Sequence, residues 1–290
     1  MSPGPEPRAP GIPPISAAPT PYARSAVGYD GLYLPKKDFR GEMRAVLRLL
    51  RAHVGITGGD WLEMACGTGL HVAHLPPAFR AEGVDVAPAM LAVARARLPR
   101  VPFHHGDMRT VDLGRRFDVV SCLFSSIGYM RTRADLERAV ATFARHVRPG
   151  GVVVIEPWFV PTAYRPGTVY MDALPGSSRT ALHQVRMIVA KRRGRLSVMD
   201  AHHLVGTPAG VEHFVERHEM GLFTEAEVAQ ALVRAGLDPT YDPVGISDRG
   251  LWIARMPDPA GVGRPARTPR GAFVRRQGAV RWKRLPARRG

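Results

Sequence analysis

Cysteine is scarce in this sequence of 290 residues, which contains only Cys66 and Cys122. Two cysteines cannot form the disulfide framework of a small secreted protein, and neither has His or Cys neighbours at zinc-ligand spacing. We therefore expect no metal site and a cytoplasmic location, where thiols stay reduced. No stretch approaches the roughly 20 apolar residues that a transmembrane helix needs, so no membrane partner is expected.

Acidic residues are also fewer than basic ones, 25 against 41, which gives a formal net charge of +16. Such a charge is typical of proteins that bind nucleic acid. However, eleven of the basic residues and a single acid lie within residues 255–290. Because the excess belongs to the C-terminal segment, we expect no specific nucleic-acid partner for the rest of the chain.

Composition divides the chain into three segments. Residues 1–25 are rich in proline, alanine and glycine, give a core nothing to bury, and are predicted to form a flexible arm. Residues 257–290 combine proline, glycine and arginine, and are predicted to form a disordered basic tail. Residues 26–256 are predicted to fold as one domain, since the apolar content of 45% is enough to build a core.

Helical and strand patterns alternate along this domain. The spacing predicts helices from residue 38 to the Gly58-Gly59 pair and over 70–75, 88–98, 133–147 and 225–235. Strands are predicted at 61–65, 81–85, 101–104, 117–124, 152–155, 238–244 and 250–256. This alternation indicates an α/β fold with a doubly wound, mostly parallel sheet. Alternating segments at 183–190 and 196–205 predict antiparallel hairpins within an insert at about 157–223.

A glycine-containing turn follows the first predicted strand, in the segment Glu63-Met64-Ala65-Cys66-Gly67-Thr68-Gly69. Glycine lacks Cβ and adopts positive φ readily, so a ligand can approach the backbone closely. No lysine follows, which excludes a P-loop. His71 occupies the place of the third glycine in the dinucleotide fingerprint, which argues against NAD or FAD.

Two further acids follow the next predicted strands. Asp85 ends the second strand, where its carboxylate can accept hydrogen bonds from both hydroxyls of an adenosine ribose. Asp107 follows the third strand and can accept from an adenine amino group. The carboxyl ends of parallel strands share one sheet edge, so these acids and the glycine turn predict an adenosine-binding site.

This combination, over about residues 29–253, resembles the class I S-adenosylmethionine-dependent methyltransferases. The resemblance implies a Rossmann-like, seven-stranded, mostly parallel sheet with one antiparallel strand, and S-adenosyl-L-methionine as cofactor without a metal. It implies that the glycine loop lies beneath the methionine part, with Asp85 at the ribose and Asp107 and Met108 at the adenine. The cofactor-binding residues expected on this basis are Tyr29, Glu63, Ala65, Cys66, Gly67, Gly69, Asp85, Val86, Asp107, Met108 and Phe124.

Four less generic stretches, at 124–130, 152–158, 213–223 and 248–251, look like those of the N-methyltransferases that act on dTDP-linked 3-amino-3,6-dideoxyhexoses. Those enzymes make dimethylamino sugars for macrolide antibiotics. The resemblance implies that this chain methylates, once or twice, the amino group of a dTDP-linked amino-deoxy sugar. The insert matches the antiparallel substrate layer of that group.

The same resemblance implies where the acceptor lies. The amine is expected near Tyr22 and Tyr129, with His213 or His218 as proton acceptors or partners of sugar hydroxyls. Tyr22 would belong to a lid, because the family places an N-terminal tyrosine over the active site. The residues expected to contact the nucleotide sugar are Ser125, Ser126, Trp158 (on thymine or the sugar) and Arg249 (on the diphosphate).

Other functions remain open at this point. The apolar Met187-Ile188-Val189 replaces a polar run expected in the family, so the acceptor could be a small molecule without a nucleotide. An RNA-binding methyltransferase that uses the basic tail is a weaker alternative, since no RNA-binding module is present. A homodimer is compatible with the sequence, which does not settle the oligomeric state.

Overall fold

The computed structural model describes residues 22–174, 183–259 and 283–284. The helices are α1 (Ala26–Tyr33), α2 (Phe39–Val54), α3 (Pro88–Arg97), α4 (Arg133–His146) and α5 (Glu225–Arg234), with 3-10 helices η1 (Val72–His74) and η2 (Ser126–Tyr129). The larger sheet holds β1 (Gly59–Met64), β2 (Phe79–Asp85), β3 (Phe103–His105), β4 (Phe117–Cys122), β5 (Val147–Ile155), β10 (Asp238–Asp242), β11 (Leu251–Arg255) and β12 (Lys283–Arg284). In these parts of the chain no helix is long and apolar enough to cross a membrane.

The strand order of the larger sheet is β12-β10-β11-β5-β4-β1-β2-β3. Neighbouring strands are parallel except β11, which runs antiparallel to both β5 and β10. The predicted seven-stranded, mostly parallel sheet is thus confirmed. The two-residue β12 adds an eighth strand from within the predicted basic tail. The rest of the tail beyond residue 259, and the predicted arm before Tyr22, lie outside the described residues.

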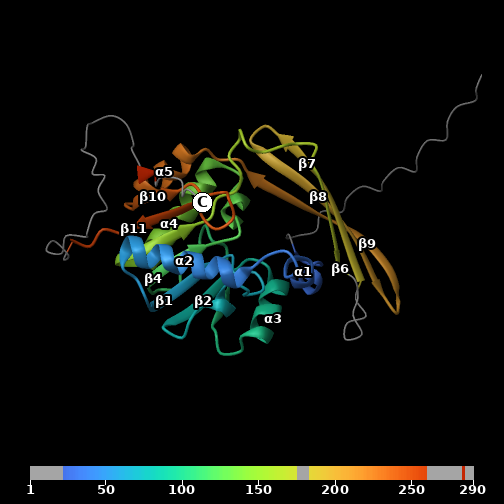
Figure 1. Ribbon diagram of the computed structural model, residues 1–290, viewed down its shortest axis with the longest axis horizontal. Helices are drawn as coiled ribbons and strands as arrows, with labels where there is room; N and C mark the ends of the chain where they lie inside the picture. The colour runs from blue at the N-terminus through green and yellow to red at the C-terminus, as the bar shows by residue number, and fades with distance from the viewer. Residues whose placement is uncertain (1–21, 175–182, 260–282, 285–290) are drawn as a thin grey trace, which may run out of the picture.

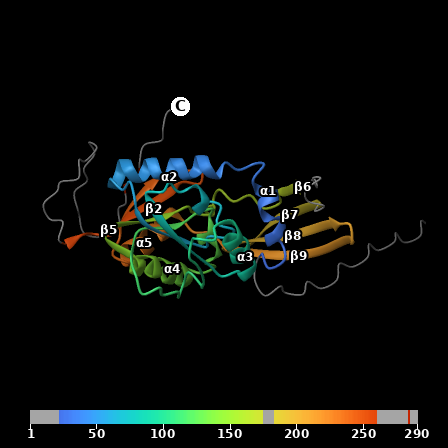
Figure 2. The same cartoon turned by 90° about the horizontal axis from the view of Figure 1, so that it is seen from below.

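Helices cover both faces of this sheet, with α2 on one side and α4 and α5 on the other (Figure 2). Side chains of β5 alternate between the two layers: Val153 and Ile155 pack with α4 and α5, whereas Val152 and Val154 pack with α2. A strand that is apolar on both faces must be covered twice, which explains why the Val152–Ile155 run is continuous rather than alternating.

A second, four-stranded antiparallel sheet follows β5 in the chain, in the order β6-β7-β8-β9. Its strands are β6 (Val169–Leu174), β7 (His183–Arg193), β8 (Leu196–Thr207) and β9 (Gly210–Gly221). The predicted antiparallel insert is confirmed, and the turn between β7 and β8 contains Gly194 at φ +58°. This sheet extends to one side of the larger sheet, and α1 lies between the two (Figure 1).

Two helical elements differ from the expectation. The helix predicted at 70–75 is wrong, because only the three residues of η1 are helical and Pro76-Pro77 disfavours helical backbone in the residue before it. Helix α1 was not predicted, because it is short and follows a proline-rich segment. It places Tyr29 and Tyr33 on one side, four residues apart.

Candidate active site

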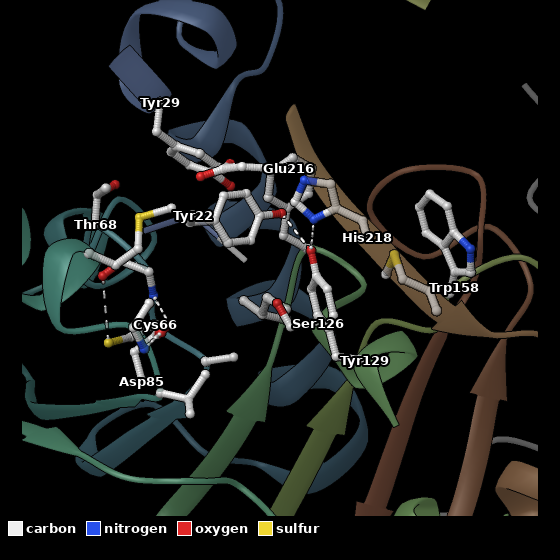
Figure 3. Close-up of a pocket in the computed structure, with 18 of the residues that line it drawn as sticks. Tyr22, Tyr29, Cys66, Thr68, Asp85, Ser126, Tyr129, Trp158, Glu216 and His218 are labelled. Carbon is white, nitrogen blue, oxygen red and sulfur yellow. Dashed lines mark hydrogen bonds between the residues drawn. The ribbon is translucent and has the colours of Figure 1, made fainter. Parts of the chain in front are cut away.

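A cavity of about 810 Å³ opens where the strands of the larger sheet end, and it is also lined by α1 and the smaller sheet. Its lining runs from Cys66 and Asp85 at one end, past Tyr22, Tyr129 and His218, to Trp158 at the other (Figure 3). Segments far apart in the sequence therefore share one chamber with two chemically different ends.

The loop after β1 forms one wall of this cavity. Ala65 and Gly67 both have positive φ, +54° and +55°. A Cβ added to Gly67 would meet no atom of residues 22–174, 183–259 or 283–284 within 4 Å, so the backbone presents an open face to the cavity. The Gly67 N–H donates to Asp85 Oδ2 at 2.8 Å, which ties the loop to the end of β2. Such a cradle admits a ligand directly against the chain.

Asp85 is almost fully buried and uses both carboxylate oxygens, since the Ala87 N–H donates to Oδ1 at 2.8 Å. Burial raises the pKa of Asp85, and the backbone hydrogen bonds from Ala87 and Gly67 oppose that rise. The carboxylate still has acceptor capacity toward the cavity, because each oxygen carries two lone pairs. This arrangement fits a vicinal diol such as a ribose.

Asp107, after β3, also lines the cavity but is held by a cation. The Arg109 Nε lies 3.0 Å from each Asp107 oxygen, and Arg109 also reaches Asp135 at 3.1 Å. The hydrogen bond from Arg109 lowers the pKa of Asp107. An ionised, oriented carboxylate beside Met108 can accept from an amino group on a purine.

A chain of hydrogen bonds joins three side chains in the middle of the cavity (Figure 3). Tyr129 Oη lies 2.8 Å from Tyr22 Oη and 2.9 Å from His218 Nδ1. Burial lowers the pKa of His218 to about 4 and raises the pKa of both tyrosines. At neutral pH the three groups are therefore uncharged. They offer hydrogen bonds without a counter-charge for a cation.

Glu216 of β9 holds the residues just before the N-terminus of α1 beside these groups. Its carboxylate accepts from the Arg24 N–H at 2.9 Å, the Ser25 N–H at 3.2 Å and the Ser25 hydroxyl at 2.6 Å. The N–H groups of Arg24 and of the N-cap residue Ser25, just before α1 begins, are thus satisfied from the smaller sheet. Because Tyr22 lies just before, Glu216 also holds that tyrosine over the cavity, with φ of +68°.

The far end of the cavity contains Trp158 and Arg249. The Arg249 guanidinium lies 5.8 Å from the centres of the Trp158 and Phe159 rings. Its Nη2 donates to Glu156 Oε1 at 2.9 Å, and Ser247 donates to the same oxygen. The Nε of Arg249 is buried and has no hydrogen-bond partner among the described residues. An aromatic face beside a cation suits a base and its phosphate.

Comparison with known proteins identifies the family to which this chain belongs. Residues 62–151 match the family model described as "Methyltransferase domain". The dTDP-3-amino-3,6-dideoxy-alpha-D-glucopyranose N,N-dimethyltransferase of Streptomyces fradiae is 40% identical over 227 residues, which are 77% of this chain and 88% of the relative. The chain belongs to this family of sugar N,N-dimethyltransferases.

Two solved structures of sugar methyltransferases have the same fold. The sugar N-methyltransferase KedS8 from a Streptoalloteichus species is 36% identical, with a TM-score of 0.75, 87% of this chain covered and 100% of that chain. CalS10, an amino pentose methyltransferase from Micromonospora echinaspora solved with S-adenosylmethionine, is 36% identical with a TM-score of 0.68 over 79% and 95%. The chain is accordingly an S-adenosylmethionine-dependent N-methyltransferase.

The residues of this N,N-dimethyltransferase family member fit the cofactor. The open Gly67 cradle and the carboxylate of Asp85 lie side by side, and Oε2 of the buried Glu63 finds no hydrogen-bond partner in the described part of the chain. Most of the residues expected to bind cofactor or acceptor line this one cavity; these are Tyr22, Tyr29, Glu63, Ala65, Cys66, Gly67, Asp85, Val86, Asp107, Met108, Phe124, Ser126, Tyr129, Trp158, His218 and Arg249.

Three expected residues do not line it. His213 lies on the outer face of the smaller sheet, stacked on His202, because it is five residues from His218 and adjacent strand residues point to opposite faces. The Ser125 hydroxyl is buried and donates to the Pro157 carbonyl at 2.7 Å. Gly69 packs against Phe103, which an added Cβ would approach to 3.3 Å. The structure therefore does not bring these three residues into the cavity lining.

The sequence did not indicate several further residues that line the cavity. Arg186 of β7 pairs with Asp172 of β6 and donates to Tyr33 Oη at 2.9 Å. All three line the cavity, together with Glu216. Period-2 alternation was the available signal, because Glu216 and His218 share one face of β9.

Proposed function

We propose that this enzyme transfers one or two methyl groups from S-adenosylmethionine to the amino group of a dTDP-linked amino-deoxy sugar, in the biosynthesis of an antibiotic. The observation that carries the proposal is the 40% identity to the Streptomyces fradiae enzyme across 88% of that relative's length. The two-ended chamber supports it, because one end fits an adenosine and the other offers an aromatic ring beside a cation.

At the cofactor end, we assign the ribose hydroxyls to Asp85, the adenine to Asp107 and Met108, and the methionine part to the Gly67 loop and Glu63. The bound cofactor supplies an electrophilic methyl group. The enzyme's contribution is to hold a neutral amine in line with it, and positioning of this kind can contribute about 7–11 kcal/mol.

The middle of the chamber favours the neutral amine. An ammonium ion entering among Tyr22, Tyr129 and His218 would lose water without gaining a negative partner from these three side chains, since all of them are uncharged at neutral pH. Glu216 also lines the cavity, but its oxygens already accept hydrogen bonds from the backbone N–H groups of Arg24 and Ser25 and from the Ser25 hydroxyl. A histidine with a pKa of about 4 is too weak a base for an alkylammonium. We therefore assign His218 the role of orienting Tyr129 rather than removing the proton.

At the far end, Trp158 would stack on the thymine or the sugar. The unpartnered Nε of Arg249 would donate to the diphosphate. Nη2 of the same guanidinium already donates to Glu156. We therefore expect Arg249 to bind the diphosphate through Nε and not through a bidentate contact that uses Nη2.

The test is incubation of the full chain with S-adenosylmethionine and a panel of dTDP-amino sugars, followed by mass spectrometry. We expect gains of one and two methyl groups on at least one sugar, together with binding of dTDP alone in calorimetry. Methylation of a free amine with no dTDP binding and no reaction of any nucleotide sugar would refute the nucleotide-sugar assignment.

Tyr129→Phe is expected to lower turnover about tenfold and to leave the Kd for S-adenosylmethionine within about twofold. The change removes the hydroxyl that joins Tyr22 to His218 and leaves His218 Nδ1 buried without its partner. Single-turnover kinetics and calorimetry measure the two quantities. Tyr164→Phe is the matched control, because Tyr164 bonds the Lys191 carbonyl outside the cavity lining. Unchanged turnover would remove Tyr129 from the acceptor site.

We also propose a homodimer formed through the outer face of the smaller sheet. Neighbouring outward side chains of β6, β7 and β8 form an exposed apolar patch, made of Val169, Met171, Val185, Met187, Val189 and Leu204. Contiguous apolar surface of this kind marks an interaction site. A sheet face packs well on a copy of itself, and two-fold dimers are the commonest soluble assemblies.

Met187→Lys is expected to convert the dimer into a monomer in sedimentation at micromolar concentration, because it buries an unpaired charge in the interface. Val233→Lys on α5 changes an equally exposed apolar residue elsewhere and should leave the dimer intact. A wild-type chain that sediments as a monomer would contradict this assembly.

A further inference from the structure

Four side chains of alternating charge run from the start of α2 to the floor of the cavity. Lys37 is paired with Glu42, Glu42 Oε2 lies 3.0 Å from His71 Nε2, and His71 Nδ1 lies 3.4 Å from Glu63 Oε1. Their side chains are only 9%, 11%, 7% and 3% exposed in this order. Burial of so many charges is tolerable only because each has opposite neighbours.

This series ends at an atom without a partner. Glu63 Oε2 is buried and makes no hydrogen bond within the described residues, although Glu63 lines the cavity. A buried carboxylate oxygen left without a donor costs free energy, so its presence marks a place where a donor from outside belongs. After the cations Lys37 and His71 and the anions Glu42 and Glu63, the next group in the alternation is a cation.

We infer that His71 is a positioning residue that orients Glu63 toward the cofactor: held between Glu42 and Glu63, it engages Oε1 and leaves Oε2 free for the α-ammonium group of S-adenosylmethionine. This inference rests on the proposed function, since it names a contact of the same cofactor. The ligand class is a primary ammonium at the methionine end of the chamber.

The imidazole of His71 can hold this position only when both ring nitrogens donate. Burial alone would lower the pKa of His71, but the hydrogen bonds and charges of Glu42 and Glu63 outweigh burial and raise it to about 9. The ring is also packed at its edge by Phe39, with ring centres 5.0 Å apart. A flip of the doubly protonated ring would turn both N–H groups away from the two carboxylates, so the ring keeps its orientation. The fixed ring in turn holds the Glu63 carboxylate in place.

Each element that packs against His71 contributes at least one charged or titratable group. Glu42 and Lys37 approach from α2 and the turn before it, and Glu63 approaches from β1. His74, at the end of η1, is also close enough for its pKa to be lowered, chiefly by burial and then by the charges of Arg40 and His71. Among the charged groups of the described residues, Glu42 and Glu63 are the two paired directly with the imidazole, and they favour its protonated form.

Two ligands separate this role from general support of the loop. S-adenosylhomocysteine carries the α-ammonium, whereas 5′-deoxy-5′-methylthioadenosine has the same adenosine but no amino-acid group. In calorimetry on the full chain, His71→Asn is expected to raise the Kd for S-adenosylhomocysteine by about 10-fold or more, and to leave the Kd for methylthioadenosine within about twofold. Glu42→Gln, which loosens the clamp without touching the cavity loop, should act in the same direction by a smaller factor.

His74→Asn is the matched control, because it changes an exposed histidine three residues along the same turn and should alter neither Kd. Equal weakening of both ligands by His71→Asn and Glu42→Gln would overturn the inference, since it would show a distorted loop. Unchanged binding of S-adenosylhomocysteine would overturn it too. If the wild-type chain bound neither ligand, the proposed function would fail first, and this inference with it.

Discussion

Replacing Asp85 by alanine is expected to weaken S-adenosylmethionine binding by at least about 100-fold, because two hydrogen bonds to a charged acceptor contribute about 3 kcal/mol or more. The side chain also fixes the cradle through the N–H groups of Gly67 and Ala87, each at 2.8 Å. Calorimetry with the cofactor measures the loss. Asp112→Ala is the matched control, because Asp112 accepts from the Gly114 N–H in an exposed turn.

The negative charge of Asp85 should favour cofactor binding but oppose folding at neutral pH. Since burial raises the folded-state pKa of Asp85 above its usual 3.8, the protonated form favours folding at low pH, and this benefit is lost as pH rises through the raised pKa. At neutral pH the ionised carboxylate therefore costs folding free energy. Asp85→Asn should bind the cofactor weakly and change the Tm only slightly, because removal of the buried charge offsets the hydrogen bond that one of the Gly67 and Ala87 N–H groups loses. A large drop in Tm would mean that Asp85 serves the fold more than the ligand.

The cofactor end could be predicted from sequence because each part follows a strand within a few residues. The Glu63–Gly69 turn, Asp85 and Asp107 follow β1, β2 and β3, which lie side by side in the sheet. Because these strands are parallel neighbours, the residues that follow them lie at the same edge of the sheet. The long-range ties were not visible, such as the hydrogen bond from Gly67 to Asp85, whose residues stand 18 positions apart.

The acceptor end was harder because its residues come from separate elements. The two-residue period of β9 already separates His213 from His218, and applying it would have excluded His213 from the cavity. No local signal pairs Glu216 with Ser25, which lies 191 residues away, so the anchoring of α1 could not be predicted. Tertiary contacts decide this end of the site.

The ion pair of Arg249 with Glu156 is another long-range contact that the sequence does not reveal. Removal of the Arg249 side chain is expected to destabilise the fold strongly. Its partner Glu156 is fully buried, and the guanidinium donates to Glu156 Oε1. Arg249→Ala leaves that carboxylate without its cation, a change that costs about 3 kcal/mol or more. Urea unfolding should show this loss directly. A raised KM for the nucleotide sugar in this variant would therefore not by itself establish a phosphate contact.

The double variant Glu156→Gln/Arg249→Met separates the two roles of the guanidinium. With no charge left to compensate, we expect most of the unfolding free energy to return, because a neutral, well-packed pair replaces a buried ion pair at little cost. Binding of dTDP should stay weak, since the donor toward the diphosphate is still missing. Arg116→Ala, at an exposed arginine, is the control for loss of charge alone. Normal dTDP binding by the stable double variant would show that Arg249 supports the fold and not the nucleotide.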